Sequence, residues 1–362
     1  MGGWAALVAL LIFHSIVFAQ ADPKTALLER AGWDALATGR AHDAAKAFRE
    51  AIASDPRNAE LYVGAGAAAM LERRDADARQ ALEYALSLDP KLSRARALLG
   101  QVLYRAGDLP GAIRQYEMLA PDDKQAAATL DRWRREAELN SRLHQTVGSH
   151  FTVSFEGPEE AALADRALDA LERAFWRVGG TLGTYPYGPI PVVLYSNEQF
   201  RDITRSPSWA AGAYDGTIRV PMRGALNDPQ ELDRVLAHEF THALVREIAP
   251  HGVPAWLNEG LATALESGDL EWAERRVRQA DGPVSLEMLA SSFSRLSGKQ
   301  AQLAYAASAL AVRQLIDDAG GPALINLLRD VGDGVSFDTA FAHRMQRGFG
   351  DFQASLGLER RD

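Results

Sequence analysis

The first half of the chain repeats its small and large apolar positions at intervals of 34 residues. Glycine, alanine and large apolar residues each return in step: Gly32, Gly66 and Gly100; Ala44, Ala78 and Ala112; Phe48, Leu82 and Tyr116; Leu36, Met70 and Tyr104. Asp55-Pro56 returns as Asp89-Pro90, and a residue before proline disfavours the helical conformation. The pattern predicts helix pairs near residues 25–54, 58–88 and 92–119, and then a longer capping helix over residues 122–146.

This period resembles the tetratricopeptide repeat (TPR), in which small residues let two helices approach closely and large residues fill the space between pairs. Such an array buries a core only by stacking its units. The resemblance implies an all-α solenoid over residues 22–146 whose concave surface docks a peptide or protein partner. The alternative is a scaffold that only holds the second domain.

Beyond the repeats, the spacing of apolar residues changes. Residues 150–155 and 190–195 have the pattern of strands, and residues 158–178 carry an apolar stripe at helical spacing. Asp215-Gly216 is a tight-turn signal that predicts a hairpin from residues 210–214 and 217–220, and everything after it has helical periodicity. The fold class is therefore α+β. The second domain, residues 147–362, is expected to contain a small mixed sheet followed by a helical half.

The N-terminal segment has the character of an export signal. Residues 1–21 contain no Asp, Glu, Lys or Arg, and Trp4 to Phe18 is a mostly apolar run. Ala19-Gln20-Ala21 then has the small-x-small form of a signal-peptidase site. We expect cleavage after Ala21 and an exported protein, periplasmic or secreted, with no stable membrane insertion. The alternative is an uncleaved membrane anchor.

Composition and charge exclude several functions. With 362 residues, 47% hydrophobic and 24% charged, the chain has the balance of a soluble globular protein of two domains. Residues 22–145 hold 19 basic and 19 acidic side chains, so the net charge of −9 falls on the rest of the chain. An acidic second half argues against nucleic acid as a partner. The absence of cysteine rules out disulfides, thiolate metal sites and a cysteine nucleophile.

The candidate chemistry is concentrated in one segment, from His238 to Glu259. Asp228-Pro229 is a helix start, and His238 and His242 lie one turn apart on that helix. Both imidazoles can therefore reach one metal ion, with Glu239 placed beside them to hold a water on the metal. Taken alone, this pattern is also compatible with solvated or core-packed side chains.

A second short helix, opened by Pro254, carries Trp256-Leu257-Asn258-Glu259-Gly260. The connection between the helices is short enough to turn one against the other and to bring Glu259 to the histidines. Two imidazoles and one carboxylate leave a fourth position open, which is the geometry of catalytic zinc, whereas calcium and magnesium prefer oxygen ligands. For Glu259 alone, a capping or surface role is the alternative.

The arrangement of His238-Glu239-x-x-His242 before Asn258-Glu259-Gly260 resembles the gluzincin metallopeptidases. Residues from about 148 to 355 are similar to the zincin-like, peptidase MA-like domains found behind tetratricopeptide repeats. The resemblance implies one Zn²⁺ per chain, bound by His238, His242 and Glu259, with Glu239 as general base. The spacer before Glu259 is shorter than in the aminopeptidases of that group, and their Gly-Ala-Met-Glu-Asn segment, which recognises a free N-terminus, is absent. An endopeptidase is therefore expected.

A further donor is needed for the oxyanion that forms when a peptide carbonyl is attacked. Tyr305, in a predicted helix over residues 300–317, is the candidate, since related domains tend to place a tyrosine on a later helix facing the metal. The alternatives are a packing role for Tyr305, or His251 as the donor, although a surface position suits a loop histidine better. The hairpin before the zinc helix is expected to offer an edge strand to an extended substrate, or else to pack inside the domain.

The sequence thus predicts an exported zinc-dependent metallopeptidase that acts on a peptide or protein substrate. The residues leave two other functions open. One is a repeat-based adaptor whose zinc-binding domain cuts nothing, and the other is a zinc hydrolase that acts on a non-peptide bond.

Overall fold

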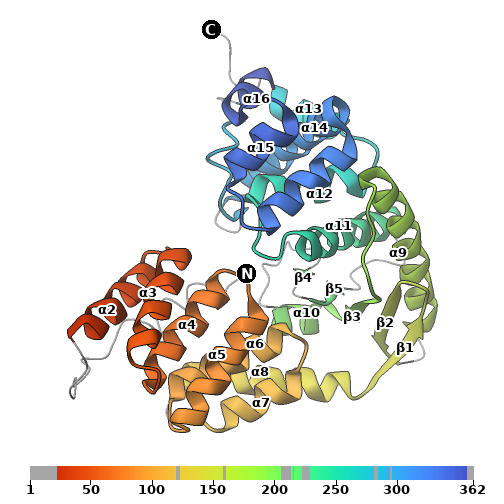
Figure 1. Cartoon of the computed structure of the whole chain (residues 1–362). Coiled ribbons are helices and arrows are strands. Elements are labelled where there is room, and N and C mark those ends of the chain that lie inside the picture. The colour runs from red at the N-terminus through yellow and green to blue at the C-terminus, as the bar shows by residue number, and fades with distance from the viewer. Residues whose placement is uncertain are drawn as a thin grey trace. The chain divides into compact units, whose positions relative to one another are not determined.

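The computed structural model divides the chain into two units, residues 1–141 and 142–362, and each is described by itself (Figure 1). It describes residues 23–119, 123–157, 160–204, 213–214, 216–221, 229–280, 284–293 and 296–356. The expected signal peptide, residues 1–21, lies outside the described residues.

The described part of the first unit consists of three helix pairs and one further helix, as the 34-residue period predicts. The helices are α2 (Pro23–Ala37) with α3 (Ala41–Ser54), α4 (Ala59–Leu71) with α5 (Asp75–Leu88), α6 (Ser93–Arg105) with α7 (Leu109–Glu117), and α8 (Lys124–Asn140). The first helices of successive pairs, α2, α4 and α6, pack on one another in series. The unit is therefore a stack of repeats with its own apolar core.

The in-step glycines are explained by close helix packing. In each pair the glycine faces the large residue of the same repeat: Gly32 against Phe48, Gly66 against Leu82, and Gly100 against Tyr116. A Cβ at these positions would meet the facing side chain at 2.7, 2.7 and 2.6 Å, closer than Cβ contacts in proteins. The 34-residue period in the sequence thus reflects the same contact between a glycine and a large side chain in each helix pair.

The last helix closes the stack, although it is shorter than expected. Trp133 of α8 is almost fully buried, stacks on Tyr104 at 4.9 Å and meets Tyr116 edge-on at 4.5 Å. The prediction of helix up to residue 146 is wrong at its end, because α8 stops at Asn140 and residues 143–147 form a strand. That strand pairs with a later one, a contact between distant segments that helical periodicity does not report.

The second unit is built on a five-stranded mixed sheet. The strands are β1 (Leu143–Val147), β2 (Phe151–Glu156), β3 (Ile190–Tyr195), β4 (Ala213–Tyr214) and β5 (Ile218–Pro221). Their order is β1-β2-β3-β5-β4, with β2, β3 and β5 parallel and the two outer strands antiparallel to their neighbours. The predicted hairpin is confirmed for residues 213–214 and 218–219, whereas residues 210–212 and Asp215 lie outside the described residues.

The remaining described elements of this unit are helices, as predicted for residues 158–178 and for the segment after the hairpin, whereas the helix at residues 197–204 was not predicted. They are α9 (Ala161–Leu182), α10 (Asn197–Thr204), α11 (Pro229–Ile248), α12 (Ala255–Glu266), α13 (Glu271–Arg278), α14 (Gly298–Gly332, interrupted at Gly320), α15 (Phe337–Met345) and α16 (Phe349–Ser355). None of the described helices is both long and apolar enough to cross a membrane.

One apolar core joins the sheet to the helices. Val192 and Ile218 of the sheet, Leu171 of α9 and Leu236 of α11 are all fully buried in it. Helix α9 packs on β2 and on α11, α11 packs on α12, and α12 lies along α14 (Figure 1). This order holds α11 and α12 side by side in the interior.

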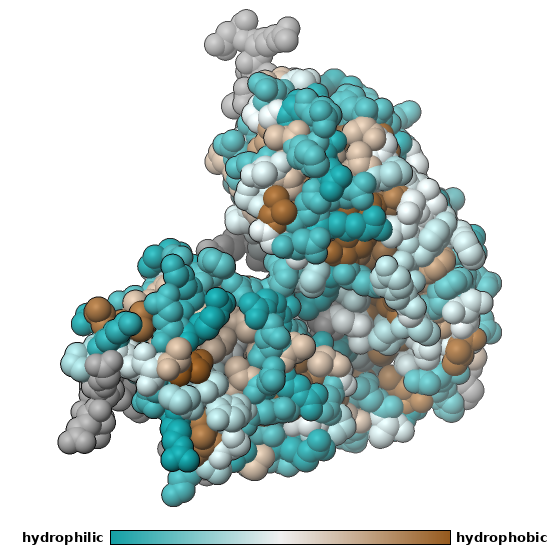
Figure 2. Space-filling view, viewed as in Figure 1, coloured by the Kyte–Doolittle hydropathy of each residue, from teal (hydrophilic) through white to brown (hydrophobic). Residues whose placement is uncertain are grey.

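On the face of the molecule in Figure 2, most exposed residues are hydrophilic and hydrophobic ones are scattered among them. Large apolar side chains that stand exposed include Leu27, Val147, Trp176, Tyr187 and Met288. Single exposed apolar side chains of this kind are usual in globular proteins. The informative features of the second unit are therefore the polar groups inside it.

The contact between α12 and α14 depends on Gly260. A Cβ there would lie 2.5 Å from the backbone oxygen of Ser308 on α14, and backbone cannot move aside as a flexible side chain can. Since Gly260 directly follows Glu259, this contact also fixes where the Glu259 side chain begins.

We predict that Gly260→Ala lowers the free energy of unfolding by about 1–3 kcal/mol, because the added methyl group overpacks the helix contact. Gly350→Ala is the matched control, since a Cβ at this exposed helical position meets nothing within 4 Å. The control should be neutral or stabilising by up to about 1 kcal/mol. Urea unfolding of both variants measures the difference, and equal stabilities would contradict the packing argument.

Candidate metal centre

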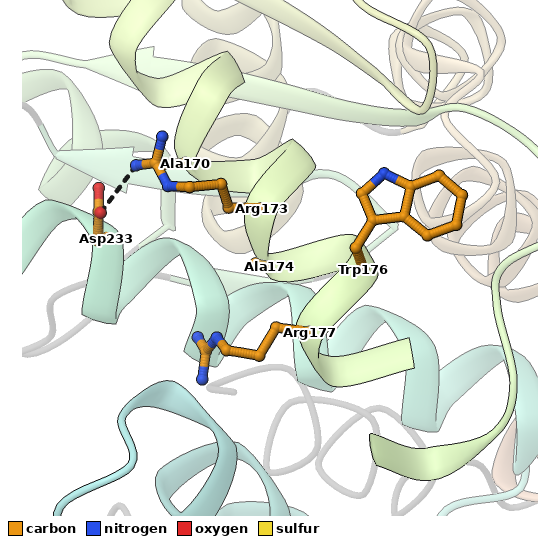
Figure 3. Close-up of a pocket in the computed structure, with 6 residues that line it drawn as sticks. All are labelled: Ala170, Arg173, Ala174, Trp176, Arg177 and Asp233. Atoms are coloured by element: carbon orange, nitrogen blue, oxygen red, sulfur yellow. Dashed lines mark hydrogen bonds and ion pairs between the residues drawn. The ribbon is translucent and has the colours of Figure 1, made fainter. Parts of the chain in front are cut away.

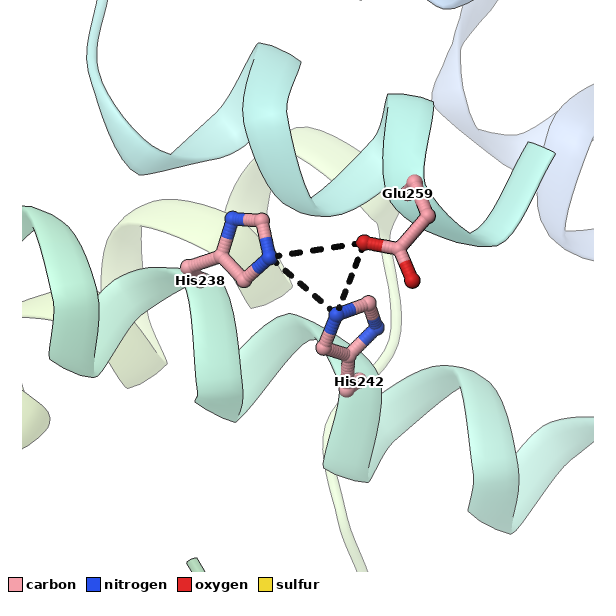
Figure 4. A group of neighbouring side chains, drawn as sticks. All are labelled: His238, His242 and Glu259. Atoms are coloured by element: carbon pink, nitrogen blue, oxygen red, sulfur yellow. Dashed lines mark hydrogen bonds and ion pairs between the residues drawn. The ribbon is translucent and has the colours of Figure 1, made fainter. Parts of the chain in front are cut away.

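Two histidines and a glutamate converge between α11 and α12, as the sequence predicts. His238 and His242 point from successive turns of α11 toward Glu259, which reaches across from α12 (Figure 4). The Nε2 atoms of the two histidines are 3.2 Å apart. Oε2 of Glu259 lies 3.7 Å from Nε2 of His238 and 3.5 Å from Nε2 of His242.

These separations fit a metal ion. Zinc with bonds of about 2.0–2.1 Å in tetrahedral geometry places its donor atoms about 3.3–3.4 Å apart. The three measured separations lie on either side of that value. The donor set of two imidazole nitrogens and one carboxylate oxygen suits zinc, and it leaves a fourth position for another ligand. Among the described residues this is the one group of side chains arranged to hold a metal ion.

Two residues that the sequence analysis missed support the triad. Nδ1 of His238 lies 2.7 Å from Oε2 of Glu266, at the last turn of α12. Since a carboxylate only accepts hydrogen bonds, Nδ1 is the donor, and Nε2 is the nitrogen that faces the shared space. The other oxygen of Glu266 accepts a hydrogen bond of 2.6 Å from Nη1 of Arg234. Arg234 in turn holds Glu231 with two hydrogen bonds of 2.7 and 2.6 Å.

A sequence signal for these two residues existed. Glu266 follows Glu259 by two helical turns, and Arg234 precedes His238 by one turn, so each lies on the same helix face as a triad residue. Spacing alone did not single them out, because many charged side chains share a face with their neighbours. By contrast, Nδ1 of His242 is buried with no hydrogen-bond partner within the described part of the chain.

The charges at the site favour a cation. Burial raises the pKa of the Glu239 carboxyl. Burial also opposes the charged form of Glu259, yet His242 and His238 hold its pKa below the usual range. For His238, burial lowers the pKa, but hydrogen bonds to Glu259 and Glu266 outweigh it and raise the pKa to about 10. The carboxylates thus stabilise positive charge between them, either as a proton on histidine or as a divalent cation in its place.

Tyr305 of α14 is brought to the same place. Its ring centre lies 6.4 Å from that of His238, and its side chain is only partly exposed. Burial, together with the charges of Glu259 and Glu239 and a hydrogen bond to Glu259, raises the pKa of its phenol. The phenol therefore keeps its proton and remains a hydrogen-bond donor. His251 is exposed in the turn between α11 and α12 and is not part of the triad.

The sheet places a strand edge beside α11, the helix that carries the two histidines. Among the described strands, β4 is the outermost one next to β5, and α11 packs against both strands. One side of β4 pairs with β5, and an edge strand of this kind can pair with an extended peptide on its other side.

Family models match both parts of the chain. The family model of the peptidase MA superfamily matches residues 170–353, and a tetratricopeptide repeat model matches residues 29–93 and 76–128. Curated proteins yield no match. Among solved structures, the first TPR of Spaghetti (RPAP3) bound to an HSP90 peptide is similar, with 20% sequence identity and a TM-score of 0.31. The match covers 32% of this chain and 96% of that chain.

We predict that the purified chain takes up about one divalent transition-metal ion. His238→Ala and Glu259→Ala should each weaken binding by more than the 10- to 100-fold that is typical of losing a supporting residue, because each removes a ligand. His251→Ala is the control and should bind like the wild type. Elemental analysis and chelator competition measure the effect. A folded wild type that takes up no added zinc would contradict the assignment.

Proposed function

The chain belongs to the peptidase MA superfamily, and on that premise we propose that it is a zinc-dependent metallopeptidase that cleaves internal peptide bonds. The observation that carries the proposal is the group of three donor atoms at tetrahedral spacing with the buried carboxyl of Glu239 beside it. A site that only bound a structural metal would need a fourth protein ligand, and it would not need a base next to the metal.

His238, His242 and Glu259 would hold the zinc ion. When bound, zinc supplies Lewis-acid chemistry, which polarises a carbonyl and lowers the pKa of water. Glu239 accepts a proton from the attacking water and delivers it to the nitrogen of the leaving amine. The water oxygen bonds to the carbonyl carbon, and the carbon–nitrogen bond breaks. The carboxyl of Glu239 is buried next to the donor atoms, where it can hold the proton between the two transfers.

Tyr305 is proposed to stabilise the oxyanion that develops on the substrate. Its phenol keeps its proton at neutral pH and lies beside the metal ligands. An extended peptide would pair with the edge strand β4, so that main-chain hydrogen bonds orient the scissile bond without a strong sequence preference. The absence of the segment that recognises a free N-terminus in related aminopeptidases supports cleavage within a chain rather than at its end.

We further propose that the protein is exported and that its repeats dock a substrate or a partner protein. The apolar, uncharged residues 1–21 support export to the periplasm or the medium, with cleavage after Ala21. The stacked first helices of the repeats support a docking surface for a substrate or a partner protein.

We predict that Glu239→Gln keeps zinc and loses peptidase activity. The amide has the size of the carboxyl but takes no proton, so kcat should fall by at least about 10²–10⁴-fold, which is the usual contribution of a general base. Fluorogenic peptides measure kcat, and elemental analysis confirms the metal content. Full activity in this variant would contradict the assigned base. A zinc-loaded wild type that hydrolyses esters but no peptide would favour the hydrolase of non-peptide bonds.

We also predict that Tyr305→Phe lowers kcat by about 10²–10³-fold with little change in KM, because it removes a donor that acts on the transition state. Tyr187→Phe is the control, since Tyr187 is 99% exposed. Steady-state kinetics on one peptide substrate suffice. An unchanged kcat would remove Tyr305 from the mechanism and leave it a packing residue.

A further inference from the structure

The end of helix α12 is buried without a usual helix cap. The last carbonyls of a helix have no partner within it, and many helices satisfy them with a left-handed residue just beyond the end. Here Ser267 follows in extended conformation, with φ −144° and ψ 161°. Leu265 and Glu266 are only 6% and 7% exposed, so water alone cannot satisfy their carbonyls.

Arginines from other helices bind these carbonyls instead. Arg177 of α9 donates from Nη1 to the oxygen of Leu265 at 2.5 Å and from Nη2 to the oxygen of Glu266 at 3.2 Å. Arg313 of α14 donates to the oxygen of Ala264 at 3.4 Å. A guanidinium at this end also suits the helix dipole, whose C-terminus is negative.

The helix held in this way carries two groups of the metal centre. Glu259 is a proposed ligand, and Glu266, bound by Arg177 through its backbone, orients His238 through its side chain. Arg234 of α11 binds the same side chain at 2.6 Å. The backbone and the carboxylate of Glu266 are thus fixed by two arginines from two different helices.

We propose that Arg177 is a positioning residue of the metal centre. Arg177 binds the C-terminal carbonyls of α12 and so fixes the position of this helix along α11. In that position Glu259 reaches the two histidines and Glu266 reaches His238. This inference rests on the proposed zinc site, and it concerns the affinity and geometry of that site rather than the chemistry of cleavage.

Comparison with the neighbouring Arg173 shows that Arg177 does not serve as an ordinary surface ion pair. Arg173 lies one turn earlier on α9 and forms an ion pair of 2.8 Å with Asp233, whereas Arg177 extends away from that pair (Figure 3). Both side chains line the same surface groove with Trp176. The hydrogen bonds of Arg177 go to backbone oxygens, and burial lowers the pKa of its guanidinium. Its position therefore costs desolvation that the charge of Asp233 offsets only in part.

The test compares Arg177→Met and Arg177→Lys with Arg173→Met in the otherwise intact chain. The dissociation constant for zinc is measured by chelator competition at a temperature well below unfolding. We expect Arg177→Met to weaken zinc binding by about 10-fold, at the lower end of the effect of supporting residues. Arg177→Lys should lie between, because lysine keeps the charge but has one nitrogen in place of the two that bind these carbonyls. Arg173→Met should match the wild type.

A second readout separates positioning from stability. With Co²⁺ in place of zinc, the visible absorption reports coordination geometry, and it should change in Arg177→Met but not in Arg173→Met. A lower unfolding temperature with wild-type zinc affinity and Co²⁺ spectrum would overturn the inference and leave the zinc site standing. If Arg177→Met does not fold, Arg177→Lys decides by the same criteria. A wild type that binds no zinc would overturn the proposed function as well.

Discussion

The second unit depends on keeping several like charges together inside an apolar core. Glu239, Glu259 and Glu266 lie within two adjoining helices and are largely withdrawn from water. Burying an ionised carboxylate is costly unless it is paired. The structure meets this cost with Arg234, with the imidazoles, and with a space between donor atoms whose size suits a divalent cation. The demand for positive charge connects the packing of this unit to its proposed chemistry.

The donor atoms can only surround a cation if the position of α12 relative to α11 is fixed closely. A tetrahedral ion tolerates a few tenths of an ångström in its ligand distances, so α11 and α12 cannot slide relative to each other. Gly260 lets α12 lie directly against the backbone of α14. Arg177 and Arg313 bind the carbonyls at the end of the same helix. Helix α12 is thus held by a backbone contact on one face and by arginines at its C-terminal end. Another face of the helix carries Glu259 toward the histidines.

The first unit is stabilised differently, by contacts between neighbouring helices. Its helices pack through a contact of glycine with a large side chain that recurs in every pair, and its core is complete without any group from the metal centre. Because each repeat contacts mainly its neighbours, the local sequence determines the architecture to an unusual degree. The role that we propose for the repeats is accordingly not in the chemistry but in the surface that they present.

The sequence by itself determined the features that arise from regular spacing. The 34-residue period located the helix pairs, and two histidines one turn apart had to share a helix face. The short connection before Glu259 restricted it to the same neighbourhood. Contacts between distant segments were decided by the tertiary structure alone. Residues 143–147 became a strand because β2 offered a partner, and Glu266 became the support of His238 because α12 packs against α11. The physical reason is that periodicity reports the face on which a residue lies, whereas the partner that it meets there depends on how whole elements pack.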